Sequence, residues 1–337
     1  MKYSESNGKQ MKKALITGIF GQDGSFLYEL LEQKGYLTYG IIKKNLSSNS
    51  CRIREELRRK GKEPAVLEVD LQDYEAVRNV VDDIRPDEVY HLSASHVSSE
   101  GKRNGQTIDD NTLFKQNVSA TANLLTACYE AAPEAKVLTA GSCLMFDASG
   151  TERQNESTVY SSQSLYGIGK ITENRLVEYY RKKGMYACTA ILYNHESYRR
   201  SEDFVTRKIV KNMCQLKKDN HHRFSLGNIE IRKDWGYAKD YAAGMHLMLQ
   251  GDCPEDYILA SGSLHSIREF IGICAEILQI DDWEEHIAVN DNVINRMNGA
   301  QLYGDARKIE NELGWKREKN LREIIYEMIT EEMRQQM

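Results

Sequence analysis

The sequence has no long apolar run, no close pair of cysteines and no excess of charge of one sign. No stretch approaches the roughly 20 consecutive apolar residues that a transmembrane helix needs, so we expect no membrane as a partner. The net charge of −5, with both signs interspersed, gives no field that favours nucleic acid. The first ten residues, MKYSESNGKQ, contain no apolar core, which predicts a flexible extension over residues 1–10 and not a signal peptide.

The seven cysteines are scattered and odd in number, and none forms a Cys-x-x-Cys pair. This pattern predicts reduced thiols and a cytoplasmic location. The sequence also lacks internal repeats, low-complexity tracts and long linkers. A chain of 337 residues therefore fits one large domain or two coupled ones.

A glycine-rich turn stands near the start of the chain. A short apolar strand is predicted over Lys13–Thr17, and a helical pattern runs from Ser25 to Gln33. Between them lie Gly18, Gly21 and Gly24. Glycines allow a tight turn and a close approach to a pyrophosphate, which is then held at the positive end of the following helix. An ordinary loop is the alternative, but the position between strand and helix favours dinucleotide binding.

The end of the second predicted strand bears on the choice of cofactor. Leu37–Ile42 is followed by Lys43 and Lys44, where an acidic residue is expected if the ribose carries a free 2′-hydroxyl. Two cations suit a 2′-phosphate, so NADP is preferred over NAD. The alternative for such a lysine pair is a solvated loop.

The remaining pattern alternates strands with helices, which predicts an α/β fold with a doubly wound parallel sheet. Further strands are expected at Ala65–Val69, Glu88–Leu92, Lys136–Ala140, Tyr186–Leu192 and Tyr257–Ser261. Helices are expected at Asn117–Ala131, Ser266–Leu278 and Leu321–Met333. Asp70 and Leu71 follow a strand where an adenine could bind, and the small residues Ser93 and Ala94 let a cofactor lie close.

Tyr166 and Lys170 form a Tyr-x-x-x-Lys arrangement. On a helix, residues four apart share a face, and a nearby ammonium favours the phenolate, so the pair can act as a base near neutral pH. By itself this spacing is more typical of a solvated helix face.

Basic residues in the second half of the chain could converge on a diphosphate, or they could form surface ion pairs. They are Arg199, Arg200, Arg207, Lys208, Arg232, Lys233 and Arg296. No convincing metal site is found, since His221 and His222 lie in a polar stretch typical of a solvated loop.

Several peptides carry a family resemblance: TGIFGQDGS, KKNLSSNSCRI, the Tyr166/Lys170 pair, NHES with FVTRKI, LGN with DWG, and GDARK with ELGW. Together they resemble the GDP-mannose 4,6-dehydratase family of extended short-chain dehydrogenase/reductases. The resemblance implies a Rossmann-type domain (11–192 plus about 232–262) and a smaller mixed α/β substrate-binding domain (about 193–231 plus 263–337). In the family the segment matching Lys43–Ile53 reaches a neighbouring subunit, which implies a homotetramer or a dimer.

The resemblance also implies roles for individual residues. Tyr166, tuned by Lys170, would take the proton of the sugar 4-hydroxyl while hydride passes from C4 to the nicotinamide, and Ser142 would hold the same oxygen. The implied cofactor-binding residues are Gly18, Gly21, Gln22, Asp23, Gly24, Lys43, Lys44, Asp70, Leu71, Leu92, Ser93, Ala94, Tyr166, Lys170, His195 and Arg200. The implied residues for a nucleotide-diphosphate sugar, expected to be GDP-linked, are Asn194, Lys208, Arg232, Lys233 and Arg296.

One departure from the family pattern concerns the elimination of water. That step needs a carboxylate, which the family supplies from a Glu, and Leu144 occupies the matching position here. The preferred interpretation is an NADP-dependent enzyme that transfers hydride at C4 of a GDP-hexose or GDP-heptose, as a dehydrogenase, 4-keto reductase or epimerase, without dehydration. Two alternatives stay open: a true 4,6-dehydratase with a relocated acid/base, for which Asp147 and Cys143 are candidates, and a catalytically weak regulatory paralogue.

Overall fold

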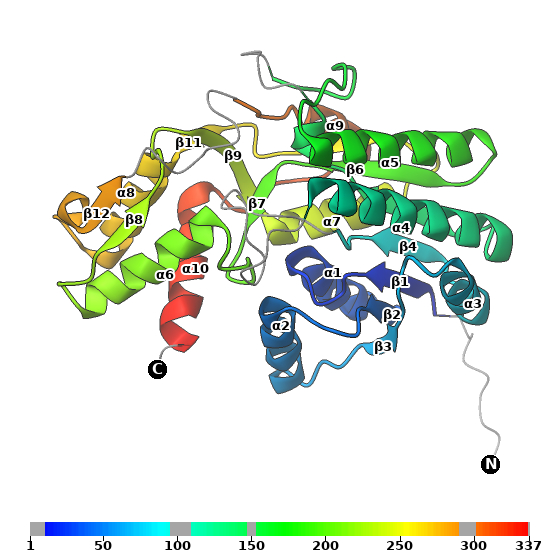
Figure 1. The fold of residues 1–337 in the computed structure, drawn as a ribbon, viewed down its shortest axis with the longest axis horizontal. Helices are drawn as coiled ribbons and strands as arrows, with labels where there is room; N and C mark the ends of the chain where they lie inside the picture. Colours follow the sequence, from blue (N-terminus) through cyan, green and yellow to red (C-terminus); the bar gives the residue numbers. More distant parts are fainter. Residues whose placement is uncertain (1–10, 95–108, 147–152, 290–300, 336–337) are drawn as a thin grey trace.

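The computed structural model describes residues 11–94, 109–146, 153–289 and 301–335. Its largest feature is a parallel sheet of seven strands (Figure 1). From edge to edge the strands are β10 (Tyr257–Leu259), β6 (Ala187–Leu192), β5 (Lys136–Ala140), β4 (Glu88–His91), β1 (Lys13–Thr17), β2 (Leu37–Ile42) and β3 (Ala65–Glu68). The chain winds outward in both directions from β1, which confirms the predicted doubly wound α/β fold.

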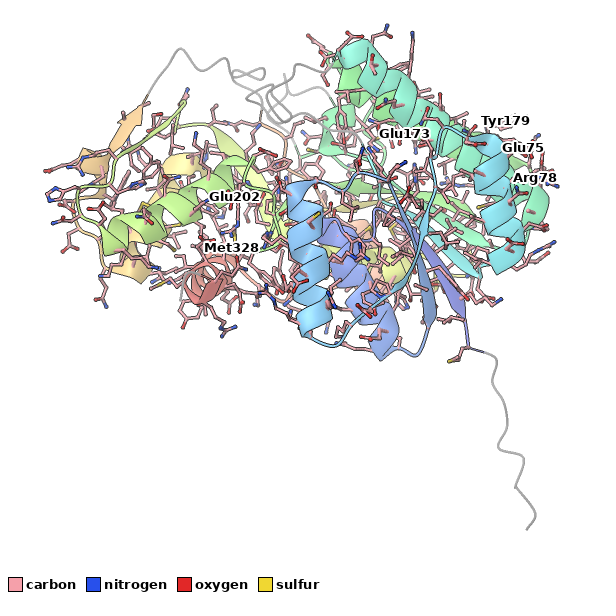
Figure 2. All side chains as sticks on the ribbon, turned by 60° about the horizontal axis from the view of Figure 1, so that its bottom comes forward. Glu75, Arg78, Glu173, Tyr179, Glu202 and Met328 are labelled. Atoms are coloured by element: carbon pink, nitrogen blue, oxygen red, sulfur yellow. The ribbon has the colours of Figure 1, made fainter. Side chains whose placement is uncertain are left out.

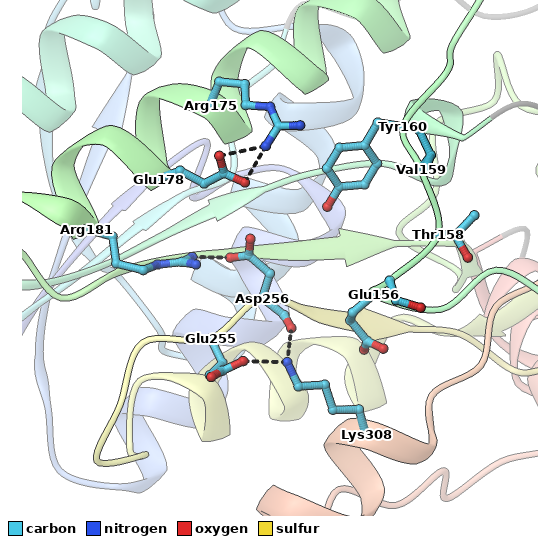
Figure 3. Close-up of a pocket in the computed structure, with 11 residues that line it drawn as sticks. Glu156, Thr158, Val159, Tyr160, Arg175, Glu178, Arg181, Glu255, Asp256 and Lys308 are labelled. Atoms are coloured by element: carbon cyan, nitrogen blue, oxygen red, sulfur yellow. Dashed lines mark hydrogen bonds and ion pairs between the residues drawn. The ribbon is translucent and has the colours of Figure 1, made fainter.

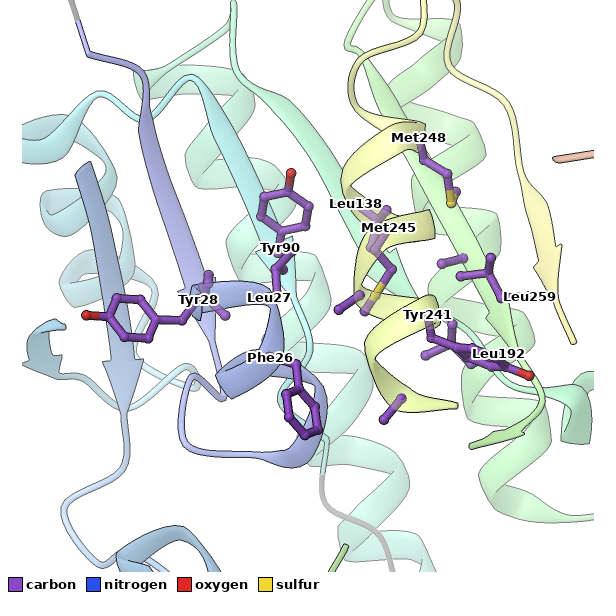
Figure 4. Packing of buried hydrophobic residues seen from close by; sticks show 14 of the residues in the cluster. Phe26, Leu27, Tyr28, Tyr90, Leu138, Leu192, Tyr241, Met245, Met248 and Leu259 are labelled. Carbon is purple, nitrogen blue, oxygen red and sulfur yellow. The ribbon is translucent and has the colours of Figure 1, made fainter. Parts of the chain in front are cut away.

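Helices cover both faces of this sheet. One face carries α1 (Gln22–Gln33), α2 (Ser48–Arg59), α7 (Ala238–Met248) and α9 (Arg307–Leu313), and the other carries α3 (Tyr74–Ile84), α4 (Asp110–Ala131) and α5 (Leu165–Lys182). Figure 4 shows how Phe26 and Leu27 of α1 and Met245 of α7 fill the first face. Burial of each such side chain contributes about 1.5–3 kcal/mol to the stability of the fold. The helices packed on both faces therefore hold the strands, and with them the strand ends, in place.

A smaller unit packs beside the sheet (Figure 1). Its helices are α6 (Val205–Lys218), α8 (Ile267–Leu278) and α10 (Leu321–Gln335), which share one apolar core. Its strands form two small sheets, one of β7 (Asn194–Glu196), β9 (Arg232–Tyr237) and β11 (Leu264–Ser266), the other of β8 (Phe224–Leu226) and β12 (Ile287–Val289). Two short 3-10 turns, η1 (Cys143–Met145) and η2 (Trp283–His286), complete the described elements.

Several element boundaries differ from the sequence-based expectations. Helix α1 begins at Gln22 and not at Ser25, so its first turn is part of the glycine-rich segment. Helix α4 begins at Asp110 and not at Asn117, because the side chain of Asp109 accepts a hydrogen bond from the backbone of Thr112 and caps the earlier start. The residues from 232 to 237 pair with β7 and β11 and not with the large sheet. None of the helices in the described ranges combines the length and the apolar character that a membrane span requires.

Candidate functional site

The glycine-rich turn brings the ends of β1 and β4 together. Gly18 has φ +75°, in the left-handed region that favours glycine, and a Cβ added there would lie 3.1 Å from the backbone of Ser93. Gly21 is the N-cap of α1, and in the described ranges no side-chain cap bonds the first-turn amides. The positive end of α1 therefore opens onto the turn, in the arrangement that suits a pyrophosphate. These residues fit the dinucleotide expected from the sequence.

An ion pair joins the same turn to the smaller unit. His195 Nε2 lies 2.9 Å from Asp23 Oδ1, and His195 Nδ1 donates to the Tyr193 carbonyl at 2.6 Å. Burial lowers the pKa of His195, but the Asp23 carboxylate more than offsets this and raises it overall. For Asp23, burial raises the pKa, while His195 outweighs it and lowers the pKa overall. The Gln22 side chain also donates to the His195 carbonyl at 3.1 Å.

The other expected cofactor residues follow the carboxyl ends of neighbouring strands. Parallel strands place these ends along one edge of the sheet, which is where ligands of open α/β sheets bind. Lys43 and Lys44 are exposed directly after β2, and Asp70 and Leu71 follow β3. After β4 come Leu92, Ser93 and Ala94.

Tyr166 and Lys170 lie in the first two turns of α5, which begins after Ser164 caps the Gly167 amide at 3.0 Å. Lys170 Nζ is 5.9 Å from the Tyr166 ring centroid. Burial raises the pKa of Tyr166 and Lys170 lowers it, with a raised value overall. The lysine is 4% exposed, so this helix face is not the solvated one that the spacing alone favoured.

Ser142 and Leu144 lie in the turn that follows β5. The Leu144 amide donates to Ser142 Oγ at 3.2 Å, and Ser142 is the N-cap of η1. A Cβ added to Gly167 would lie 2.1 Å from the Leu144 carbonyl oxygen, so η1 packs directly against the turn of α5 that carries Tyr166. Burial raises the pKa of the neighbouring Cys143 to about 11, which leaves a neutral thiol that is a poor base near pH 7.

Sequence analysis missed a buried carboxylate beside the lysine. Lys170 Nζ donates to Glu173 Oε2 and to the Ala140 carbonyl, each at 2.9 Å. Glu173 is 3% exposed. Its place on the ribbon is labelled in Figure 2. The three-residue spacing from Lys170 was the available signal, because residues three apart on a helix are neighbours.

Of the six basic candidates that the structure describes, Arg200 is partly buried and pairs with Glu196 at 3.6 Å, and two others, themselves fully buried, form ion pairs. Arg199 pairs with Glu29 at 2.8 Å and Glu56 at 2.7 Å and ties α1 to α2. Arg207 of α6 pairs with Glu332 of α10. For these two, ion pairing within the protein is the arrangement observed.

The other candidates are placed as follows. Arg200 stacks on Phe204, with Cζ 3.7 Å from the ring centroid. Asn194 Nδ2 donates to the Asp234 carbonyl at 3.3 Å, and Arg232 donates to the Leu264 carbonyl at 3.1 Å, with Glu269 nearby. Burial lowers the pKa of Lys233. Lys208 lies in α6, whereas Arg296 and Asp147 lie outside the described residues.

A cavity of about 390 Å³ lies away from these residues, between α5 and the segment 156–160 (Figure 3). Its cations are already neutralised by partners within the cavity: Arg175 by Glu178, Arg181 by Asp256, and Lys308 by Glu255. Within the ranges that the structure describes, no group of three or more His, Cys, Asp or Glu side chains could hold a metal ion.

Comparison with known proteins gives a consistent result. A family model described as GDP-mannose 4,6 dehydratase matches residues 15–328. GDP-mannose 4,6 dehydratase 1 of Arabidopsis thaliana is 35% identical, covering 96% of this chain and 91% of its own length. Among solved structures, UDP-glucose 4-epimerase of Thermotoga maritima with UDP-glucose has a TM-score of 0.81 at 18% identity, covering 96% of this chain and 99% of its own. RMD from Pseudomonas aeruginosa complexed with NADPH has a TM-score of 0.77 at 18% identity, covering 98% and 100%. These two likenesses concern the fold.

Proposed function

Because the chain belongs to the GDP-mannose 4,6-dehydratase family, we propose that it is an NADP-dependent enzyme that transfers hydride at C4 of a GDP-hexose or GDP-heptose and does not dehydrate the sugar. Leu144 carries this proposal. The turn that holds it packs against the first turn of α5, so position 144 adjoins the reacting tyrosine. A leucine side chain there can neither give nor take a proton.

We assign the proton transfer at C4 to three side chains, one in the turn after β5 and two in the first two turns of α5. Tyr166 exchanges the proton of the C4 oxygen, and Ser142 holds that oxygen in line. The Lys170 ammonium stabilises the phenolate when the proton has left. A bound nicotinamide would accept hydride from the same carbon when oxidised, or donate hydride to it when reduced.

The cofactor assignment rests on the glycine-rich turn and on Lys43 and Lys44. The exposed lysines follow β2, which pairs with β1, the strand that precedes the glycine-rich turn. From there their ammonium groups can contact the 2′-phosphate of NADP. Solved neighbours of similar fold are described with NADPH in one case and with NAD in another, so they support a nicotinamide cofactor without selecting between the two. A dimer or tetramer, expected from the resemblance, is a prediction that light scattering tests.

A dehydratase that uses Cys143 as the relocated acid/base finds less support. Cys143 is the nearest thiol to Ser142 in the chain, and its raised pKa, about 11, makes it a poor base for the C5 proton. The intact trio of Ser142, Tyr166 and Lys170 also weighs against a regulatory protein without activity.

Mass spectrometry of the sugar nucleotide tests the proposal. Purified protein is incubated with NADP and GDP-mannose, or with a GDP-heptose, and in parallel with NADPH and the corresponding 4-keto sugar. We expect a product that is lighter or heavier by two hydrogens, with matching reduction or oxidation of the cofactor. An isomer inverted at C4 would have unchanged mass and is identified by NMR of the sugar. A product lighter by one water would overturn the proposal.

A further inference from the structure

A buried chain of hydrogen bonds runs from the end of β1 to the lysine of α5. Thr17 Oγ1 lies 2.8 Å from His91 Nδ1, and His91 Nε2 lies 3.1 Å from Thr121 Oγ1. Thr121 Oγ1 donates to Glu173 Oε2 at 3.1 Å, and Lys170 donates to the same oxygen at 2.9 Å. Each of these five side chains is at most 4% exposed. The chain therefore belongs to the protein interior and not to the solvent.

The direction of every bond in this chain follows from its first member. The Thr17 oxygen accepts from the two backbone amides that follow β4, at 3.1 and 3.2 Å, so its single proton is donated to His91 Nδ1. Burial, with a smaller contribution from Lys170, lowers the pKa of His91 to about 3, so the ring is neutral and carries its proton on Nε2. That proton is donated to Thr121, whose own proton is donated to Glu173.

The hydrogen-bond chain is thus directed toward Glu173, whose Oε2 is the last acceptor. Oε2 receives the Thr121 hydroxyl and the Lys170 ammonium. Oε1 makes no hydrogen bond within the described part of the chain. Glu173 and Lys170 therefore form a buried ion pair, with the Thr121 hydroxyl as a second donor to the same carboxylate oxygen.

The carboxylate acts on Tyr166 through the lysine. An ammonium beside a phenol favours the phenolate, whereas a carboxylate favours the phenol. Burial raises the pKa of Tyr166, Lys170 lowers it and Glu173 raises it. Among the described residues, the other titratable groups that face this cluster are His91 from β4, Cys143 from η1 and Arg200 from the connection after β7.

We propose that Glu173 is a positioning residue: it fixes the Lys170 ammonium between itself and the Ala140 carbonyl and opposes its charge, so that Tyr166 keeps its phenolic proton at neutral pH. The inference rests on the proposed function and gives it a direction. Tyr166 is set to donate to a ketone oxygen at C4: its O–H bond breaks, an O–H bond forms on the sugar, and a reduced nicotinamide is the hydride source. Solvent then reprotonates the phenolate. Reduction of a 4-keto sugar nucleotide is the favoured reaction.

The test follows the Tyr166 phenol itself, by NMR of protein carrying tyrosine isotopically labelled at Cζ. The resonance that is missing in Tyr166→Phe identifies Tyr166, and a pH titration without cofactor or sugar gives its pKa. In Glu173→Gln we expect this pKa to fall by about one unit, because the Lys170 charge is then unopposed. The acid limb of the pH profile for sugar oxidation moves down by the same amount.

Two variants separate charge from packing. Glu173→Asp keeps the charge, and its Tyr166 titration stays near that of the wild type. Glu178→Gln makes the same chemical change on an α5 residue that pairs with Arg175 at the surface, and it leaves Tyr166 unchanged. An unchanged or raised Tyr166 pKa in folded Glu173→Gln overturns the proposal.

The wild-type titration keeps the test decisive if Glu173→Gln does not fold. The proposal expects Tyr166 to titrate above its ordinary value of 10.0, and a value below 10.0 overturns it. Because the NMR titration needs no turnover, the expected shift together with an absence of sugar chemistry would refute the proposed function alone.

Discussion

Replacement of Leu144 by glutamate should restore water elimination. The backbone of η1 already lies against the α5 turn that carries Tyr166, and Leu144 is half-buried, so a longer polar side chain can reach the sugar without entering the deep core. The new carboxylate would take the proton at C5 and pass it to the departing C6 hydroxyl. Wild-type protein and Leu144→Glu are compared by mass spectrometry, with GDP-mannose or the best sugar nucleotide found.

The expected increase in the dehydration rate follows from the general acid–base catalysis that a carboxylate at position 144 restores. General acid–base help typically contributes 10²- to 10⁴-fold, roughly 3–5 kcal/mol of barrier. Leu144→Gln is the matched control, since it loses the same apolar contacts with the cluster around Cys143 and Phe146 but gains no acid. We expect dehydrated product to form at least about 10²-fold faster in Leu144→Glu than in Leu144→Gln. Equal rates in the two variants would refute the assignment of position 144.

Three further predictions concern binding and stability. Lys43→Ala combined with Lys44→Ala should weaken NADP binding about tenfold by calorimetry and leave NAD binding unchanged, since only NADP carries the 2′-phosphate; an equal change for both cofactors would contradict this. Arg199→Ala removes the buried guanidinium that pairs with Glu29 and Glu56 and leaves them the exposed Lys60 as a cation partner. The free energy of unfolding in urea should fall by roughly 3–5 kcal/mol, whereas a loss under about 1 kcal/mol would argue against it. The raised pKa of His195 means that its pairing stabilises the protein fully below pH 6.5 and less as the pH rises through that pKa, so Asp23→Asn should cost more stability at low pH than at high pH; a pH-independent difference would contradict the pairing.

The strands of the large sheet could be predicted closely because each is a short apolar run bounded by turn residues. Lys13–Thr17, Leu37–Ile42 and Lys136–Ala140 end where the sequence predicted. The family motifs likewise located the tyrosine and lysine of α5. Both kinds of signal are local, so the sequence displays them directly.

What could not be predicted depends on contacts between distant parts of the chain. Arg199 forms an ion pair with Glu56, which lies 143 positions earlier in the sequence. No local sequence pattern predicts that pair. Glu173 resembles a surface residue of a helix until α4 is packed over it and supplies Thr121 as a donor. Which charged groups surround Tyr166 is therefore determined by tertiary packing and cannot be read from the local sequence.

The central claim is that hydride transfer at C4 survives while elimination is lost. A sugar nucleotide carrying deuterium at C4 tests both halves in a single turnover with purified protein and NADP. Because hydride transfer at C4 is reversible, the account predicts that this reverse, oxidative turnover puts deuterium on the cofactor and forms no product lighter by water. A product that has lost water and retains the deuterium, with no net reduction of the cofactor, would contradict it.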